Sequence, residues 1–175
     1  MTGNDHPPGD EFQDVATFLV SAKFHVFLDE TLLSCACQAV DHFLENHKGI
    51  KNSQLHAISP LIRSGGLKAL MELIKNQKDK NSSETNKAFW NFVYRLVEPA
   101  ADNPDFSLYR QISQQLAAEK ILEDTAQAAD KQAAKTLKKN NKKKIDRVMD
   151  EVIPVYFEHF TCHYFYKNKP KTKEI

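Results

Sequence analysis

The densest chemical feature of the sequence is a run of basic residues toward its C-terminal end. The stretch KQAAKTLKKNNKKKIDR, residues 131–147, holds eight basic residues against a single acid, Asp146. Lysine side chains neutralise phosphates and release the counterions around a nucleic acid, which gives binding that does not depend on base sequence. We therefore expect contacts to nucleic acid from Lys135, Lys138, Lys139, Lys142, Lys143, Lys144 and Arg147.

The alternative explanation for this run is a solvated helix end, where the helix dipole favours cations. The rest of the chain is comparatively acidic, because the whole sequence carries a net charge of only +1. Lys142, Lys143 and Lys144 are expected to lie off the apolar face of the last helix, so that changing them should leave folding nearly unaffected. Both explanations stay open at this point, since either one places the lysines in solvent.

A second group of residues could bind a metal ion. His159, Cys162 and His163 have the spacing i, i+3, i+4, which puts them on one face of a helix, and histidine and cysteine are zinc ligands. Cys35 and Cys37 could complete such a site, but one residue between two cysteines is not a usual zinc spacing and no glycine accompanies them. We expect ordinary partly buried residues here, with no metal and no other cofactor.

The C-terminal stretch VYFEHFTCHYFYKNK combines aromatic residues with lysines. Aromatic side chains beside lysines can stack on unpaired bases, and they also make ordinary core and subunit contacts. Tyr156, Phe160 and Tyr164 share one helical face, which favours a core or a protein interface. Motifs for catalysis are missing: there is no glycine-rich phosphate loop, no HExxH and no GxSxG. We expect a protein that is not an enzyme.

Composition limits the class of protein. The 175 residues, 41% of them apolar, suffice for one domain. We expect a disordered acidic N-terminus over residues 1–11, a helical bundle over 12–167 and a flexible basic tail over 168–175. Three cysteines, an odd number, argue against a disulfide framework and for a reducing compartment. No signal peptide or membrane span is recognisable, so we expect a cytoplasmic location.

The apolar spacing predicts an all-α fold of six or seven helices. Asp29 is expected to cap the second helix and Gly49 to end it, and Trp90 is expected in the core. Gly65 and Gly66 predict a tight corner between helices, with positive φ at one of the two. The expected helices cover residues 12–28, about 30–48, a short segment within 55–62, 67–75, 88–97, 108–137 and a last helix around 145–164, kinked at Pro154, with a polar loop over 76–87.

The segments CACQAVDHFLENH and LHAISPLIRSGGLKALMELI resemble part of a known family. Pro60, Ile62, Gly66, Leu67 and Leu70 carry the resemblance, which covers about residues 35–78. The chain resembles the small helical subunit of type III-B CRISPR effector complexes. That resemblance implies a helical bundle with no catalytic role. It implies packing along the effector backbone subunits and against copies of itself, with basic side chains on the duplex of guide RNA and target. Nearby basic candidates are Lys68, Lys75, Lys78 and Lys80.

The same region supports a different class of protein. IRSGGLKALMELIKNQKD followed by NKAFWNFVYRLVEPA is similar to one armadillo-type repeat, in which a glycine turn precedes a leucine-rich helix. This would indicate a protein-binding scaffold or adaptor. A solenoid needs about three stacked repeats, and the sequence contains no second copy of the pattern.

Overall fold

The computed structural model describes residues 12–47, 49–58, 60, 66–80, 83–100 and 102–168. The predicted N-terminus and nearly all of the predicted basic tail lie outside these residues. The all-α, single-domain prediction is confirmed, and the described residues contain no strand. The elements are α1 (Gln13–Leu19), α2 (Ala22–Val26), a π-helical segment η1 (Phe27–Leu32), α3 (Leu33–Asn46), α4 (Asn52–His56), α6 (Leu67–Lys80), α7 (Glu84–Val97), α8 (Leu108–Ala118), a 3-10 turn η2 (Thr125–Gln127) and α9 (Lys131–Lys167).

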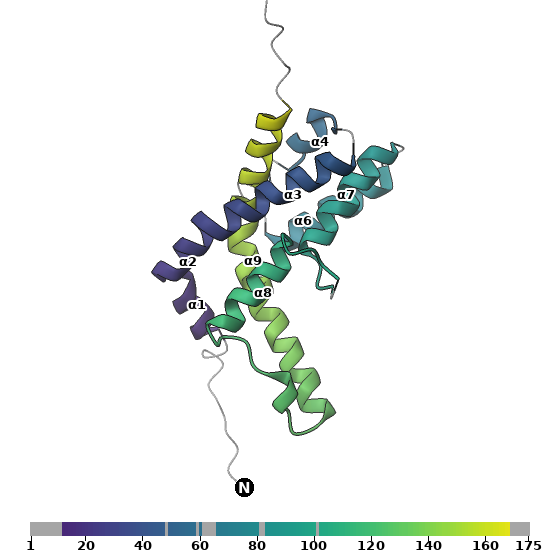
Figure 1. Cartoon of the computed structure of the whole chain (residues 1–175). Coiled ribbons are helices and arrows are strands. Elements are labelled where there is room, and N and C mark those ends of the chain that lie inside the picture. The colour runs from purple at the N-terminus through teal and green to yellow at the C-terminus, as the bar shows by residue number, and fades with distance from the viewer. Residues whose placement is uncertain are drawn as a thin grey trace, which may run out of the picture.

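Helix α9 organises the bundle. It has 37 residues and packs against α1, α3, α6 and α8. In Figure 1 it runs from the lower end of the molecule to the top, and α3 crosses its upper half. Its C-terminal half supplies a continuous stripe to the core, and of the two predicted roles for Tyr156, Phe160 and Tyr164, core or protein interface, the structure places all three in the core. The fully buried members of this stripe include Val148, Met149, Val152, Ile153, Tyr156, Phe157 and Phe160.

Helix α7 is the predicted core helix. Trp90 is completely buried, its ring lies 5.1 Å from that of Phe89, and its indole Nε1 donates a hydrogen bond to Gln54 Oε1 at 2.7 Å. The buried N–H therefore has an acceptor, which removes the main penalty of burying tryptophan. Helix α6 is longer than predicted, since it continues to Lys80 and shortens the expected polar loop.

The predicted cap at Asp29 is wrong. Asp29 lies inside η1, which joins α2 to α3 without a break. The chain instead breaks at Ser21, whose hydroxyl oxygen accepts a hydrogen bond from the Phe24 amide at 3.2 Å and caps α2. The wider π turn accommodates Phe27 and Leu32, five residues apart and both buried.

The prediction of a single helix over residues 108–137 is also wrong. Helix α8 ends at Ala118, and Lys120 has a left-handed φ of 58°. The Ile121 amide donates to the Leu116 carbonyl at 2.9 Å, the Lys120 amide donates to the Ala117 carbonyl at 3.0 Å, and the Ile121 side chain is buried. This is the hydrogen-bond pattern of a Schellman motif, with lysine where glycine is usual.

Gly66 has a different role from the one predicted. Its φ is not positive, and Gly65 lies outside the described residues. A Cβ atom on Gly66 would lie 2.3 Å from Asp150 Oδ1, the atom that accepts a hydrogen bond from the Leu67 amide at 2.8 Å. Glycine is therefore needed for the close approach of α9, whose Asp150 satisfies the first amide of α6. Leu70, one turn later, is fully buried.

Candidate nucleic-acid interface

The first third of α9 extends out of the bundle, as the lower end of the helix in Figure 1 shows. No residue from 131 to 143, all of them described, is buried, and the first buried side chain is that of Lys144. Asp130 caps the helix, since its Oδ1 accepts from the Ala133 amide at 2.8 Å. We call residues 131–143 the lysine arm; at about 1.5 Å per residue it is roughly 20 Å long.

The lysines of the arm share one face. Lys131, Lys135, Lys138 and Lys142 follow the spacing i, i+4, i+7, i+11, which makes a straight stripe on an α-helix. Lys139 and Lys143 lie directly beside this stripe, and all six are exposed, whereas the partly buried side chains belong to other positions. Those partly buried side chains are Ala133, Ala134, Leu137, Asn140 and Asn141.

Few of these charges are neutralised within the protein. Lys142 pairs with Asp146, and Arg147 pairs with Glu151 at 2.7 Å, each one turn along the helix. In the described part of the chain, no ion pair is formed by Lys131, Lys135, Lys138 or Lys139. The stripe therefore presents a net positive face to solvent.

The position of the arm removes one explanation for its charge. The lysines lie in the first third of α9, far from the C-terminal end where the helix dipole favours cations, and Lys131 lies in the first turn, where the dipole disfavours them, so the dipole does not account for the run. Lysines four apart also repel one another, at about 0.2–0.5 kcal/mol per pair. The arm contains four such pairs, which are 131/135, 135/139, 138/142 and 139/143. A phosphate bound along the stripe would relieve this repulsion.

Lys144 does not belong to the exposed set, and its predicted solvent position is wrong. Only 7% of the residue is exposed; its Nζ donates to Asp14 Oδ2 at 2.7 Å and to the Ile121 carbonyl at 3.0 Å. The ammonium group therefore joins α1 and the end of α8 to α9. A buried, hydrogen-bonded lysine of this kind is structural, because removing it would leave two groups without their partner.

The C-terminal end of the lysine arm, which we call its root, is held by a further pair of hydrogen bonds. The Glu123 amide donates to Asn141 Oδ1 at 2.9 Å, and Asn141 Nδ2 donates back to the Glu123 carbonyl at 2.8 Å. The side chain of Asn141 thus pairs with the backbone of the segment that leads from α8. Sequence reasoning missed this contact, since asparagine in a polar run carries no sign of its partner.

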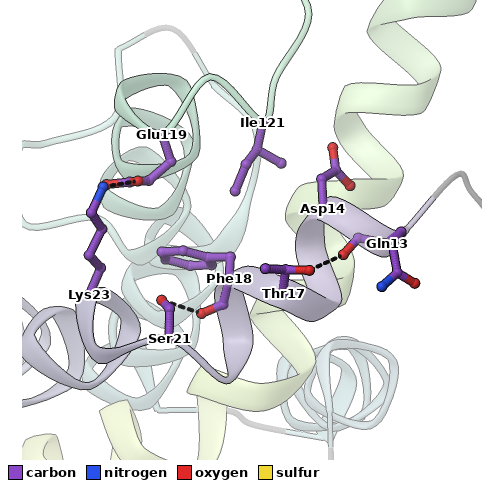
Figure 2. Close-up of a pocket in the computed structure, with 8 residues that line it drawn as sticks. All are labelled: Gln13, Asp14, Thr17, Phe18, Ser21, Lys23, Glu119 and Ile121. Carbon is purple, nitrogen blue, oxygen red and sulfur yellow. Dashed lines mark hydrogen bonds and ion pairs between the residues drawn. The ribbon is translucent and has the colours of Figure 1, made fainter.

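Figure 2 shows a groove beside this root, between α1 and the end of α8. Its volume is about 490 Å³, and Phe18 and Ile121 contribute its apolar wall. Lys23 and Glu119 form an ion pair of 2.6 Å at its edge. Thr17 and Ser21 donate to nearby backbone carbonyls. Asp14, which also lines the groove, pairs with Lys144 of α9. Most polar side chains of the groove are thus engaged within the protein.

The candidate metal residues are placed as follows. Cys35 is buried, and burial raises the pKa of its thiol to about 11, whereas Cys162 is exposed. His163 Nε2 lies 3.0 Å from Asp41 Oδ1, and His159 is partly buried on the same helix as Cys162. Within the described residues, no group of three His, Cys, Asp or Glu side chains is arranged to hold a metal ion.

No family model, curated protein or solved structure matches this chain. None of the described helices is both long and apolar enough to cross a membrane. The function must therefore be inferred from the lysine arm and its surroundings.

Proposed function

We propose that this protein binds nucleic acid without cutting it, and that the lysine arm lies along a phosphate backbone. The observation that carries the proposal is the exposed stripe of Lys131, Lys135, Lys138 and Lys142 on a helix that extends from the bundle. The stripe covers about 17 Å of helix axis. Each strand of a duplex carries one phosphate per about 3.4 Å of helix axis, so several phosphates lie within reach of the flexible lysine side chains. Lys139, Lys143 and Arg147 complete the contact set, and Lys144 does not belong to it.

We further propose a place for the protein in a larger assembly. The resemblance carried by Pro60, Ile62, Gly66, Leu67 and Leu70 suggests a small, non-catalytic subunit of a type III CRISPR effector complex in the cytoplasm. Such a subunit would pack along the backbone subunits and against copies of itself, with the lysine arm on the guide RNA or its target. The all-α fold agrees with this assignment. Genes for effector backbone subunits and a nuclease beside the gene for this chain would support it, and their absence would count against it.

The second class, an armadillo-like scaffold or adaptor, has weaker support. It rests on the hairpin of α6 and α7, which pack closely on each other. Helix α6 also packs against α9, and the described helices do not repeat this hairpin. Capture of a peptide that is insensitive to salt would favour the scaffold.

The lysine arm is tested by reversing part of its charge. The variant K135E/K138E/K139E changes three exposed lysines without touching the buried Lys144. A matched control, K23E/K51E/K120E, makes the same change of charge with exposed lysines that neither the arm nor the family resemblance offers as nucleic-acid contacts. Binding of both variants to labelled single-stranded RNA is measured over a series of salt concentrations, alone and in the assembled complex.

We expect the arm variant to bind more weakly at low salt and to lose about 0.7 in log–log salt slope for each phosphate contact removed, so about 2 in total. The control should keep most of the wild-type slope, and both should unfold at nearly the wild-type temperature. RNA incubated with the wild type should stay intact on a gel. Equal binding by all three proteins at every salt concentration would refute a role for the arm.

A further inference from the structure

A small cavity lined by aromatic rings lies between α3, α7 and the segment that joins α7 to α8. His42 of α3, Phe92 of α7 and Phe106 line it, and its volume is about 170 Å³. The His42 ring lies 6.1 Å from Phe92 at an interplanar angle of 20°, and 5.0 Å from Phe106. Arg95 and Asp102 lie at its edge, joined by an ion pair of 3.3 Å. We call this cavity, defined by these five residues, the aromatic niche.

The size of the aromatic niche limits what it can hold. Sites for drug-sized ligands have volumes of about 300–1,000 Å³, so this cavity suits a single planar ring. Phenylalanine and histidine rings are the surfaces on which proteins stack unpaired bases. Phe92 and Phe106 are only partly buried and His42 is exposed, so the rings are accessible from solvent.

The charged edge adds directional hydrogen bonding. The Arg95 and Asp102 side chains are 53% and 81% exposed, and an exposed ion pair contributes little stability, so its partners can exchange for a ligand. A guanidinium group donates to the O6 atom of guanine, and a carboxylate accepts from N–H groups. Guanine carries O6 next to its N1–H and N2–H₂ donors, an arrangement that matches this pair of side chains.

Two hydrogen bonds at Asn103 hold the loop that carries Asp102. Asn103 is only 2% exposed, and its Nδ2 donates to the Glu98 carbonyl. The Arg110 guanidinium donates to the Asn103 carbonyl at 2.7 Å. In the described part of the chain, Asn103 Oδ1 is buried without a hydrogen-bond partner. The backbone beside Asp102 is therefore held in place, which favours a site formed before its ligand binds.

A hydrogen bond joins the aromatic niche to the buried part of α9. Tyr156 of α9 donates its hydroxyl to the Phe106 carbonyl at 3.4 Å. One wall of the niche is therefore held against the core helix of the bundle.

We propose that the aromatic niche binds one unpaired guanine base of a single-stranded nucleic acid, a proposal that rests on the nucleic-acid-binding function proposed above. The base stacks on the rings of His42 and Phe92, the Arg95 guanidinium donates to O6, and the Asp102 carboxylate accepts from N1–H and N2–H₂. The competing explanation is that the rings only cover the core, since Phe92 also packs 5.4 Å from Phe43. That explanation predicts no preference among bases.

The test is a titration of the full, ¹⁵N-labelled chain followed by NMR. The probes are guanosine, adenosine, cytidine and uridine monophosphates, with inorganic phosphate as the reference for phosphate binding alone. We expect guanosine monophosphate to shift the amide signals of His42, Arg95 and Asp102, and to bind at least about fivefold more tightly than uridine monophosphate. D102N should remove this preference, and H42L should weaken binding of all four nucleotides at these amides.

The control variant is D105N, in the same loop. Asp105 is 84% exposed and pairs with Arg110 at 3.1 Å, so the substitution removes a comparable charge and ion pair outside the aromatic niche. The arm variant K135E/K138E/K139E should keep the guanine response unchanged even if its RNA binding is lost, which separates failure of the arm from failure of the aromatic niche. Shifts no larger than those with phosphate, or equal behaviour of D102N and D105N, would overturn the proposal.

Discussion

The two parts of α9 are fixed by different interactions. From Ile145 onward the helix buries an apolar and aromatic stripe among α1, α3, α6 and α8. From 131 to 143 no side chain is fully buried, and the side chain of Asn141 ties this segment to the backbone of Glu123. Packing therefore defines where one part lies, while the other part keeps its charged surface available. One continuous helix can therefore serve as a core element over one part of its length and as a binding surface over the other, and Lys144 marks the boundary between the two parts.

The largest contrast is expected from truncating one side chain on each part. Phe160 is fully buried, and F160A should lower the free energy of unfolding by about 3–5 kcal/mol, because it leaves a cavity in the core. K139A, in the arm, should change it by less than about 0.5 kcal/mol. Urea denaturation of both variants measures the difference. A comparable loss in the two would mean that the arm is held by packing after all.

The boundary residue should give an intermediate effect. K144A removes a nearly buried ammonium group that bonds Asp14 and the Ile121 carbonyl, so we expect a loss of about 1–3 kcal/mol. The same measurement with K139A gives the baseline for an exposed lysine. If K144A were as neutral as K139A, the boundary between the two parts would have to lie further along the helix.

The smallest expected effect on stability concerns the C-terminal end of α9. Asp41 Oδ1 accepts from Lys167 Nζ and His163 Nε2, both at 3.0 Å. Burial raises the pKa of Asp41, but the hydrogen bonds from Lys167 and His163 outweigh it and hold the pKa below its usual value. An acid with a depressed pKa stabilises the fold above its unfolded pKa of about 3.9 and loses that contribution as the pH falls.

We therefore expect D41N to lower the free energy of unfolding at pH 6 by less than about 1 kcal/mol, since the Asp41 side chain is 41% exposed. The difference from wild type should begin to shrink as the pH falls below about 4, where the unfolded chain takes up a proton at Asp41, and should vanish only below the depressed folded-state pKa, where both states are protonated. Urea denaturation at pH 6 and pH 3 measures it, with D79N on the exposed end of α6 as control. A difference that grew at pH 3 would contradict this assignment.

Local apolar spacing was enough to predict the core helices. Phe89, Trp90 and Val93 repeat at helical intervals in one short segment, and all three are buried. The lysine stripe was visible as a run, but its one-sidedness depends on knowing that residues 131–143 are helical. The buried role of Lys144 was not predictable, because its partner Asp14 lies 130 residues away.

The turn after α8 was missed for a different reason. Alanine, glutamine, glutamate and lysine over residues 114–120 all favour helix, so propensity continues through the point where the chain stops being helical. What ends α8 is the left-handed Lys120 together with the burial of Ile121, a tertiary contact that local sequence does not reveal. The cap assigned to Asp29 failed similarly, since Phe27 and Leu32 keep the chain helical through a π turn.

The fastening at the root of the lysine arm has a consequence for how the gene can change. The Ile121 carbonyl lies 3.0 Å from Lys144 Nζ, so the chain leaves the bundle and returns to it at neighbouring points. Residues 122–143 form an excursion closed at its base, which Figure 1 shows as the segment that descends from α8 and rises again as α9. One in-frame insertion or deletion there would add or remove the arm without rerouting another helix. Homologues of this protein should therefore vary in length between residues 122 and 143 while keeping the helical bundle.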